Sequence, residues 1–233
     1  MDNAARARRR VLALFLPVAA VLYICAEAIS PQGTDKVASD TASALELLGI
    51  AAKHPAQVYA AGTFAVLGLG ALAVSYVAIA TLTRGRGSAV ATVAALIGGV
   101  GAFCGATVNV LVFPDLAAAA SAHLPAAAAA AFLVTISTSG FAYGFMAVYF
   151  IGIYAGPALM GFALWRSRAV PRWLAILFFA GLEVAQQQIS SGPIVILYML
   201  PFAIAMVLLA ARIWQAASLP ADQPEPEPAR VPM

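Results

Sequence analysis

Six polar side chains inside long apolar segments are the residues of this sequence whose types could do chemistry. They are Glu183, Gln187 and Ser190 in one segment, and Asn109, Glu27 and Tyr23 in two others. The first three are spaced four and then three residues apart, so they share one stripe of a helix. If the segments pack with these faces together, carboxyl, amide and phenol groups would line an outward-opening cavity. Such a cavity could bind an ion, a proton or a small ligand.

Glu183 is the strongest of these candidates because it lies well inside an apolar segment. A carboxyl group at such a depth costs about 2.5–3.5 kcal/mol on insertion scales, so its presence needs a reason. One interpretation is structural: a protonated Glu183 hydrogen-bonds to Asn109 or to a carbonyl freed at Pro201. The other is functional, with Glu183 as a ligand, ion or proton site. The sequence leaves both interpretations open.

Other kinds of chemistry lack their residues. No lysine lies inside an apolar segment, so a retinal Schiff base is excluded, and the spans offer no histidine pair for haem. His54, His123, Asp115 and Asp40 could gather outside the membrane, but their spacing is typical of solvated loop residues rather than of a metal site. Hydrolase and phosphate-binding motifs are also missing. We therefore expect no metal, no cofactor and no catalytic residue.

The elements that must position these residues are transmembrane helices. Hydrophobic residues make up 63% of the chain and charged residues 10%, with a mean hydropathy of +0.91. A soluble domain carries about 25% charged residues, so this chain could not cover itself with a water-compatible surface. The basic residues stand at segment ends rather than in a patch with aromatics, which excludes nucleic acid as a partner. The sequence predicts an all-α, polytopic transmembrane bundle in contact with the lipid bilayer.

Six spans can be drawn within a single domain of residues 1–217. They cover residues 11–29, 56–82, 88–113, 143–165, 172–190 and 192–214. We interpret the first as a span rather than a cleaved signal, because its apolar run approaches the roughly 20 residues that cross a bilayer. Residues 218–233 are rich in proline and acidic residues, a composition that predicts a disordered tail.

The basic residues also predict the orientation of these spans. One side of the drawn topology carries Arg6, Arg8, Arg9, Arg10, Arg84, Arg86, Arg166, Arg168, Arg172 and Arg212. The other side carries only Lys36 and Lys53. By the positive-inside rule both termini, including the tail, are cytoplasmic. The Ala, Arg, Gly and Pro bias fits a GC-rich bacterial genome, so we expect a multi-pass protein of the bacterial plasma membrane.

Two segments outside the spans allow alternatives. Residues 40–53 begin with a capping-type Asp40, and we expect their apolar residues Leu45, Leu47, Leu48 and Ala51 on one side. This pattern indicates an amphipathic helix on the membrane surface or an ordered loop. Residues 124–142 are apolar but interrupted by hydroxyl residues. They form an outer loop leading into the fourth span, a re-entrant piece, or part of the fourth helix itself.

Small residues predict where the helices pack closely. Gly101 and Gly105 form a GxxxG pair on one face with Asn109, while Gly140, Gly144, Gly152 and Gly156 are spaced in multiples of four. Glycines on one face let a neighbouring backbone approach, and Asn109 could then hydrogen-bond across the contact. We expect these contacts within the chain rather than in a dimer.

The stretch from Arg166 to Leu174, RSRAVPRWL, resembles a step found in uncharacterised six-span bacterial integral membrane proteins. Those families also have an acidic, leucine-rich helix before the second span, similar to residues 40–53 here. The resemblance implies a six-helix bundle and brings no reaction or functional residue with it.

Three functions remain open. The first is a non-enzymatic membrane module: a subunit, an assembly partner, or a lipid- or small-molecule-binding protein, in contact with another protein or as a homo-oligomer. The second is a small proton-coupled transporter or permease that uses the cavity around Glu183, with Pro17, Pro157 and Pro201 bending its helices. The third is a membrane-embedded enzyme acting on a lipid. The absence of a catalytic constellation favours the first.

Overall fold

The computed structural model describes residues 3–32, 34, 38–83, 85–121, 124–186 and 194–218, which form eight helices and no strand. In chain order these are α1 (Asn3–Ile29), α2 (Thr41–Lys53), α3 (Pro55–Ala80), α4 (Ser88–Ser121), α5 (Ala126–Ser137), α6 (Gly140–Ser167), α7 (Arg172–Gln186) and α8 (Val195–Ser218). The predicted all-α class is confirmed.

Five of these helices, α1, α3, α4, α6 and α8, are long and apolar enough to cross a membrane. The described part of α7 has 15 residues. At 1.5 Å per residue it is about 22 Å long, less than the roughly 30 Å of a hydrocarbon core. The predicted fifth span continued to residue 190, and residues 187–190 lie outside the described part of the chain. The sixth crossing therefore stays a prediction.

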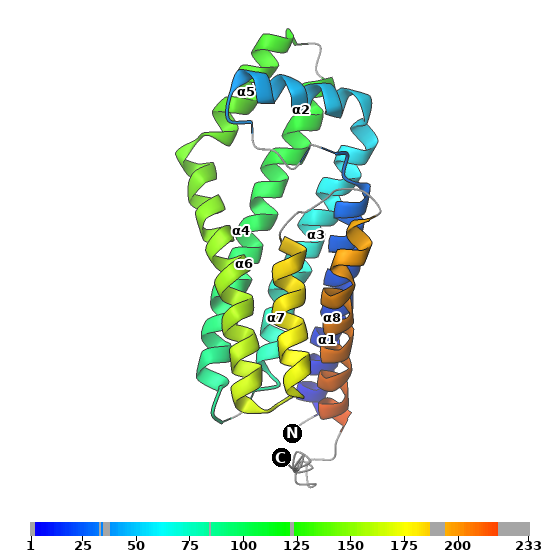
Figure 1. Cartoon of the computed structure of the whole chain (residues 1–233), viewed down its shortest axis with the longest axis vertical. Coiled ribbons are helices and arrows are strands. Elements are labelled where there is room, and N and C mark those ends of the chain that lie inside the picture. Colours follow the sequence, from blue (N-terminus) through cyan, green and yellow to red (C-terminus); the bar gives the residue numbers. More distant parts are fainter. Residues whose placement is uncertain are drawn as a thin grey trace.

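The long helices form a closed ring (Figure 1). Following the chain, α1 packs on α3, α3 on α4, α4 on α6, α6 on α7 and α7 on α8, and α8 returns to α1. The inward faces of the helices in the ring form one apolar core, whose largest fully buried side chains include Tyr76, Phe178 and Phe202. We call this ring the bundle. Within the bundle α7 packs between α6 and α8, and α7 is the helix that carries Glu183.

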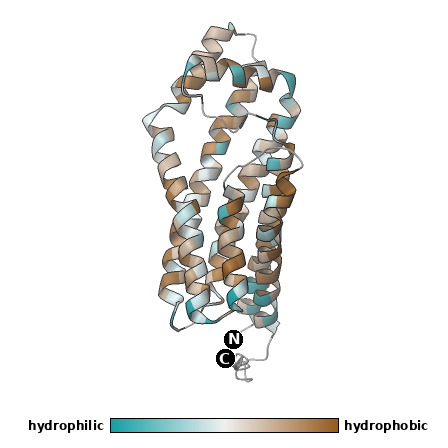
Figure 2. Ribbon diagram, viewed as in Figure 1, coloured by the Kyte–Doolittle hydropathy of each residue, from teal (hydrophilic) through white to brown (hydrophobic). Residues whose placement is uncertain are grey.

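Hydrophilic residues gather at the end of the bundle where both termini lie (Figure 2). The beginning of α1 and the end of α8 lie at the same end, where the Arg10 guanidinium donates to Ser218 Oγ at 3.0 Å. The α3–α4 and α6–α7 turns, with Arg86 and Arg166, lie at this end too, and hydrophilic residues gather there. We call it the arginine end.

The opposite end is covered by α2 and α5, which pack on α4 and on each other. These two helices and the adjoining ends of α3 and α4 are called the cap. It has a separate apolar core, built mostly from alanine and leucine: Ala38, Ala44, Leu47, Leu48, Ala51, Val58, Leu116, Ala117, Ala119, Ala129, Ala130 and Leu133. The sequence did not predict the cap as a unit. It gave a helix at residues 40–53 only as an alternative to a loop, and it did not predict α5 as a separate helix.

α2 is a helix because Asp40 caps it. Asp40 Oδ1 accepts from the Ser43 backbone N–H at 2.8 Å, and Ser43 Oγ accepts from the Asp40 N–H at 3.1 Å. Its buried face, however, covers α4 and α5, so it is not a helix that merely lies on a membrane surface. The prediction for Leu45 was wrong: this side chain is 41% exposed, because it lies about 200° around the helix from Leu47.

Near the cap, the helices do not end where the drawn segments end. The third span was expected to end at residue 113, but α4 continues through Pro114 to Ser121 and buries Leu116 in the cap. Residues 124–142 are neither a loop nor one continuous helix with the fourth span, since α5 ends at Ser137 and α6 begins at Gly140. The break forms where Thr138 Oγ1 bonds to the Val134 carbonyl and Ser139 caps α6.

Candidate functional site

The structure brings Tyr23 and Glu27 of α1 together with Tyr149 of α6. The side chains of Tyr23 and Tyr149 are hydrogen-bonded, and Glu27 lies within electrostatic range of the Tyr149 hydroxyl. Tyr23 is only 4% exposed. We call these three residues the tyrosine cluster. It joins two helices that are not neighbours in the ring, because α3 and α4 lie between α1 and α6 along the chain of contacts.

Glycines on the intervening helices make room for this cluster. A Cβ at Gly105 of α4 would lie 2.5 Å from Cδ2 of the Tyr149 ring. A Cβ at Gly68 of α3 would lie 3.0 Å from the backbone nitrogen of Tyr23. No side chain larger than hydrogen fits at either place without movement of the neighbour. The glycines therefore set how closely the two tyrosines approach.

Asn109 was expected to hydrogen-bond across a helix contact. Instead its Nδ2 donates to the Gly105 carbonyl of its own helix at 2.8 Å. The bond nevertheless ends on the glycine against which the Tyr149 ring packs. Asn109 thus satisfies its amide locally, one turn beyond the tyrosine cluster.

Glu183 has a different partner from the one proposed for it. It is half-buried on α7 and lies within electrostatic range of Tyr76 on α3, which is 2% exposed. The Tyr76 ring packs edge-on against Phe178 with centroids 6.5 Å apart, and its hydroxyl would lie 3.1 Å from a Cβ at Gly156. Glu183 therefore faces the middle of the bundle from α7.

The predicted constellation is not one cluster, because Glu27 lies within electrostatic range of Tyr149 and Glu183 within electrostatic range of Tyr76. Tyr149 and the Gly156 that contacts Tyr76 are seven residues apart on α6, which corresponds to about 10 Å along the helix. Gln187 and Ser190, the other members of the predicted stripe, lie outside the described residues. Neither Tyr76 nor Tyr149 was among the predicted site residues. The available signal was a tyrosine inside a span, where a buried hydroxyl needs a partner.

The predicted packing glycines are placed unevenly. Gly101 of α4 lies directly against Gly152 of α6, and a Cβ at Gly156 would lie 2.6 Å from the Gly98 Cα. A Cβ at Gly140 or Gly144, in contrast, would meet nothing within 4 Å. The close face of α6 is therefore shorter than the four-glycine pattern predicted, and begins only after the first two.

In the part of the chain that the structure describes, no group of three His, Cys, Asp or Glu side chains could hold a metal ion. His54 caps the start of α3 through its backbone position, and Asp115 lies within α4. His123 is outside the described residues. Cys25 and Cys104 are both free thiols.

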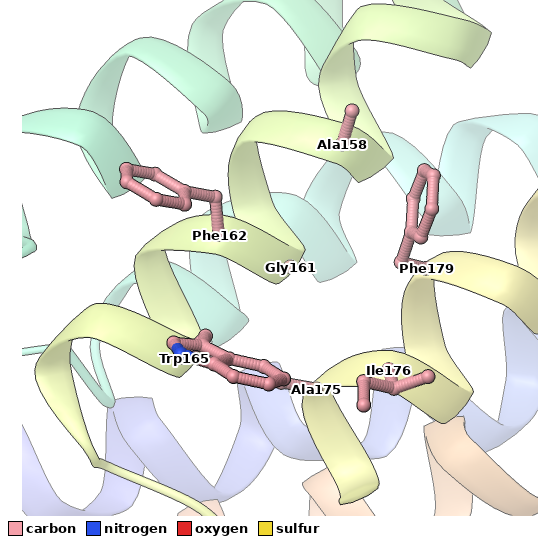
Figure 3. A pocket seen from close by; sticks show the side chains of 7 residues that line it. All are labelled: Ala158, Gly161, Phe162, Trp165, Ala175, Ile176 and Phe179. Carbon is pink, nitrogen blue, oxygen red and sulfur yellow. The ribbon is translucent and has the colours of Figure 1, made fainter. Parts of the chain in front are cut away.

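Two apolar grooves occur near the arginine end, and each has a tryptophan beneath an arginine. The larger, about 380 Å³, lies between α6 and α7 (Figure 3). The Arg172 guanidinium stands 5.3 Å from the centre of the Trp165 ring, which lines this groove. The smaller, about 170 Å³, lies between α1 and α8, where Arg10 stands 5.4 Å from the Trp214 ring. Neither pair is adjacent in the sequence, where Arg172 is followed by Trp173, because each pair and each groove depends on how two helices pack.

Comparison with protein-family models, with curated protein sequences and with solved structures finds no match to this chain. The class of protein follows from the fold alone. Five apolar helices of spanning length, closed into a ring by the shorter α7 and with polar side chains inside, are the architecture of a helical membrane protein.

Proposed function

We propose that this chain is a non-catalytic membrane module that works by binding a lipid, a small molecule or a partner protein at its membrane-facing surface. One observation carries the proposal: the described interior is closed by contacts within the chain, whereas the grooves open outward. Glycine backbones of α4 and α6 touch, and the Tyr23 and Tyr149 hydroxyls are paired with each other. The α6–α7 groove, in contrast, opens outward, and its larger side chains are 39–52% exposed: Phe162, Trp165, Ile176 and Phe179.

The finer topology belongs to the same proposal. With α7 and the residues that follow it as a full crossing, the chain has six spans and both termini on one side. The gathering of arginines at the arginine end supports a cytoplasmic position for that side, in a bacterial plasma membrane. The cap would then face the outside.

Native mass spectrometry of the protein extracted together with its own lipids tests the binding role. We expect an adduct, either lipid or a second polypeptide, that survives at a fixed stoichiometry. Protein unfolded in the same detergent is the control, since it retains detergent and lipid without a fixed ratio. A bare monomer under all extraction conditions would contradict the proposal.

A second function, a proton-coupled carrier, is favoured by two carboxyl groups that each lie within electrostatic range of a tyrosine. Glu183 beside Tyr76 and Glu27 beside Tyr149 place two titratable groups at different depths, as a proton pathway needs. Proteoliposomes with an imposed pH gradient and a pH-sensitive dye inside provide the test. A carrier would leak protons only with its solute present, and Glu183→Gln would stop the leak without loss of folded protein. An equal loss of expression in Glu183→Gln and Glu183→Ala would indicate a structural carboxyl instead.

A further inference from the structure

The groove between α6 and α7 has an apolar floor and aromatic walls. Gly161 forms part of the floor, where a Cβ would lie 3.0 Å from the Phe179 Cβ and so would push the helices apart. Figure 3 shows Trp165 reaching across from α6 toward Ala175 and Ile176 of α7, with Phe179 farther from the arginine end. The groove therefore runs along the bundle and is closed on its arginine side by an indole ring.

The walls of this groove are exposed although they are strongly apolar. Phe162 is 52% exposed, Trp165 41% and Ile176 50%. In a bundle that crosses a membrane, exposed apolar side chains such as these would face lipid tails. A hollow lined by them admits a flexible hydrocarbon chain and excludes water.

Cationic side chains are frequent in the segment that joins α6 to α7, at the arginine end of the groove. Residues 165–173 contain Arg166, Arg168 and Arg172 and no acidic residue. All three side chains are exposed, and none is paired with a carboxylate of the described residues. Guanidinium groups bind phosphate oxygens through two parallel N–H donors, and this sequence offers no nearby carboxylate to bind the ammonium of a zwitterionic headgroup.

Trp165 connects the apolar and the cationic parts of the site. The Arg172 guanidinium lies over the Trp165 ring, 5.3 Å from its centre. A guanidinium within about 6 Å of an indole centre is attracted to the ring by a cation–π interaction, which leaves its N–H groups free to donate to another partner. Arg172 is thus held at the mouth of the groove with its donors available.

The α1–α8 groove provides an internal comparison. It also has an arginine over a tryptophan, but it is less than half as large, and the Arg10 Nη2 already donates to Ser218 Oγ at 3.0 Å. This second arginine therefore has a protein partner, and its groove has less room for a hydrocarbon chain.

We propose that the α6–α7 groove binds one anionic phospholipid from the leaflet at the arginine end. One acyl chain lies against Phe162, Ile176 and Phe179, and the phosphodiester is held by Arg172 with Arg166 and Arg168 around it. The inference rests on the proposed binding function and names the ligand class and its place. Clusters of basic residues beside transmembrane helices select anionic lipids, each contributing about 1 kcal/mol, or roughly a fivefold change in affinity.

Quenching of Trp165 by brominated lipids tests this assignment, because the chain has three tryptophans and only Trp165 lines this groove. The double substitution Trp173→Phe and Trp214→Phe leaves Trp165 as the single reporter. The protein is reconstituted into phosphatidylcholine vesicles that contain increasing fractions of either brominated phosphatidylglycerol or brominated phosphatidylcholine. We expect the anionic lipid to quench Trp165 at a several-fold lower fraction than the zwitterionic lipid.

Two variants of the reporter protein separate the headgroup from the acyl chain. Arg172→Gln should reduce the preference for phosphatidylglycerol roughly fivefold. Ala158→Phe, on the exposed side of α6, should fill the groove and reduce quenching by both lipids. Arg10→Gln, beside the other groove, is the matched control and should leave the preference unchanged. Size-exclusion profiles establish that each variant is folded.

Equal quenching by the two lipids, or a preference that survives Arg172→Gln together with Arg166→Gln and Arg168→Gln, would overturn the inference. Neither result would decide the broader binding role. If native mass spectrometry still found a fixed protein partner, the module would bind a protein and not this lipid. If it found neither partner nor lipid, both proposals would fail.

Discussion

The bundle and the cap are held together in different ways. The bundle closes where helix backbones touch, with Gly101 against Gly152 and Gly98 against Gly156. The cap closes through alanine and leucine side chains of α2, α4 and α5, and its outer helix exposes Glu46 and Lys53. The first arrangement is typical of helices in lipid and the second of helices at a water-exposed surface.

This difference has a physical basis. Lipid tails are as apolar as leucine, so helices in a bilayer gain little from burying leucine and rely on close packing of small residues and on hydrogen bonds. In water, removing apolar surface is itself favourable, by about 25 cal/mol per Å². The stability of the cap should therefore depend on how much apolar area is buried, and that of the bundle on how closely its helices pack. The following variants test that distinction, from the largest expected effect to the smallest.

Gly152→Leu should have the largest effect. Its side chain would overlap the backbone of Gly101, and neither helix can move away without opening the α4–α6 contact. Overpacking usually costs about 1–3 kcal/mol, and a backbone clash in the centre of the ring should exceed that range. We expect no monodisperse protein in size-exclusion chromatography. Gly144→Leu, two turns earlier on the same helix with nothing within 4 Å, is the control and should behave as the parent.

Leu47→Ala should have the next largest effect, confined to the cap. Leu47 is 4% exposed, and removing a buried leucine side chain typically costs about 2–5 kcal/mol. We expect faster amide hydrogen exchange in α2 and α5 with unchanged protection in α3 and α6. Leu45→Ala, at a 41% exposed position on the same helix, should change neither region. Faster exchange throughout the bundle would mean that the two regions fold as one unit.

These two regions also differ in how far the sequence predicts them. Hydropathy finds the long helices, because each must satisfy its own backbone in lipid. It does not find all of their ends, since α1 begins at Asn3 and α4 ends at Ser121, each eight residues beyond the predicted segment. The cap was harder: Pro114 indicates a helix end, but burial of Leu116 at the other side of it favours continuation of α4. Sequence periodicity records which face is apolar, but not whether that face meets lipid or another helix.

The candidate site shows the same limit. The sequence drew attention to Tyr23, Glu27 and Glu183 through their chemistry, since polar groups in a span need partners. It could not supply the partners, because Tyr149 and Tyr76 come from helices whose order around the ring depends on packing. Asn109 donates its hydrogen bond to the backbone of its own helix for a related reason, because a carbonyl one turn earlier is always within reach.

Tyr149→Phe should have a modest effect on the bundle. It removes the hydrogen bond with Tyr23 and keeps the ring that packs on Gly105. Hydrogen bonds between transmembrane helices contribute about 0.6 kcal/mol on average and up to about 1.7 kcal/mol. We expect a small decrease in thermal stability, measured in detergent by loss of the folded size-exclusion peak. Tyr143→Phe, 58% exposed on the same helix, should leave it unchanged. A severe loss would mean that the tyrosine cluster, rather than glycine contact, closes the ring.

The smallest effect should come from protonation of the Asp40 carboxylate at the start of α2. Hydrogen bonds from the Ser43 backbone N–H and the Ser43 hydroxyl hold the pKa of Asp40 below its ordinary value of 3.8. Because the pKa of Asp40 is lower in the folded state, the contribution of its carboxylate to the stability of α2 is fully present above pH 3.8. It is lost as the pH falls through the pKa of the folded state. We expect protection of the first turn of α2, corrected for intrinsic exchange rates, to fall below about pH 4 while α3 keeps its protection.

Asp40→Asn separates the charge of residue 40 from its hydrogen bond to the start of α2. Asparagine also accepts the Ser43 N–H bond, so α2 should remain folded but lose its acid sensitivity. Asp40→Ala should instead weaken the first turn at every pH, since neither oxygen remains. An acid response that persists in Asp40→Asn would assign it to another carboxyl group, and Glu46 on the same helix is the next to substitute. Acid that loosened the bundle as well as α2 would show that the two regions are electrostatically coupled, which their separate cores do not predict.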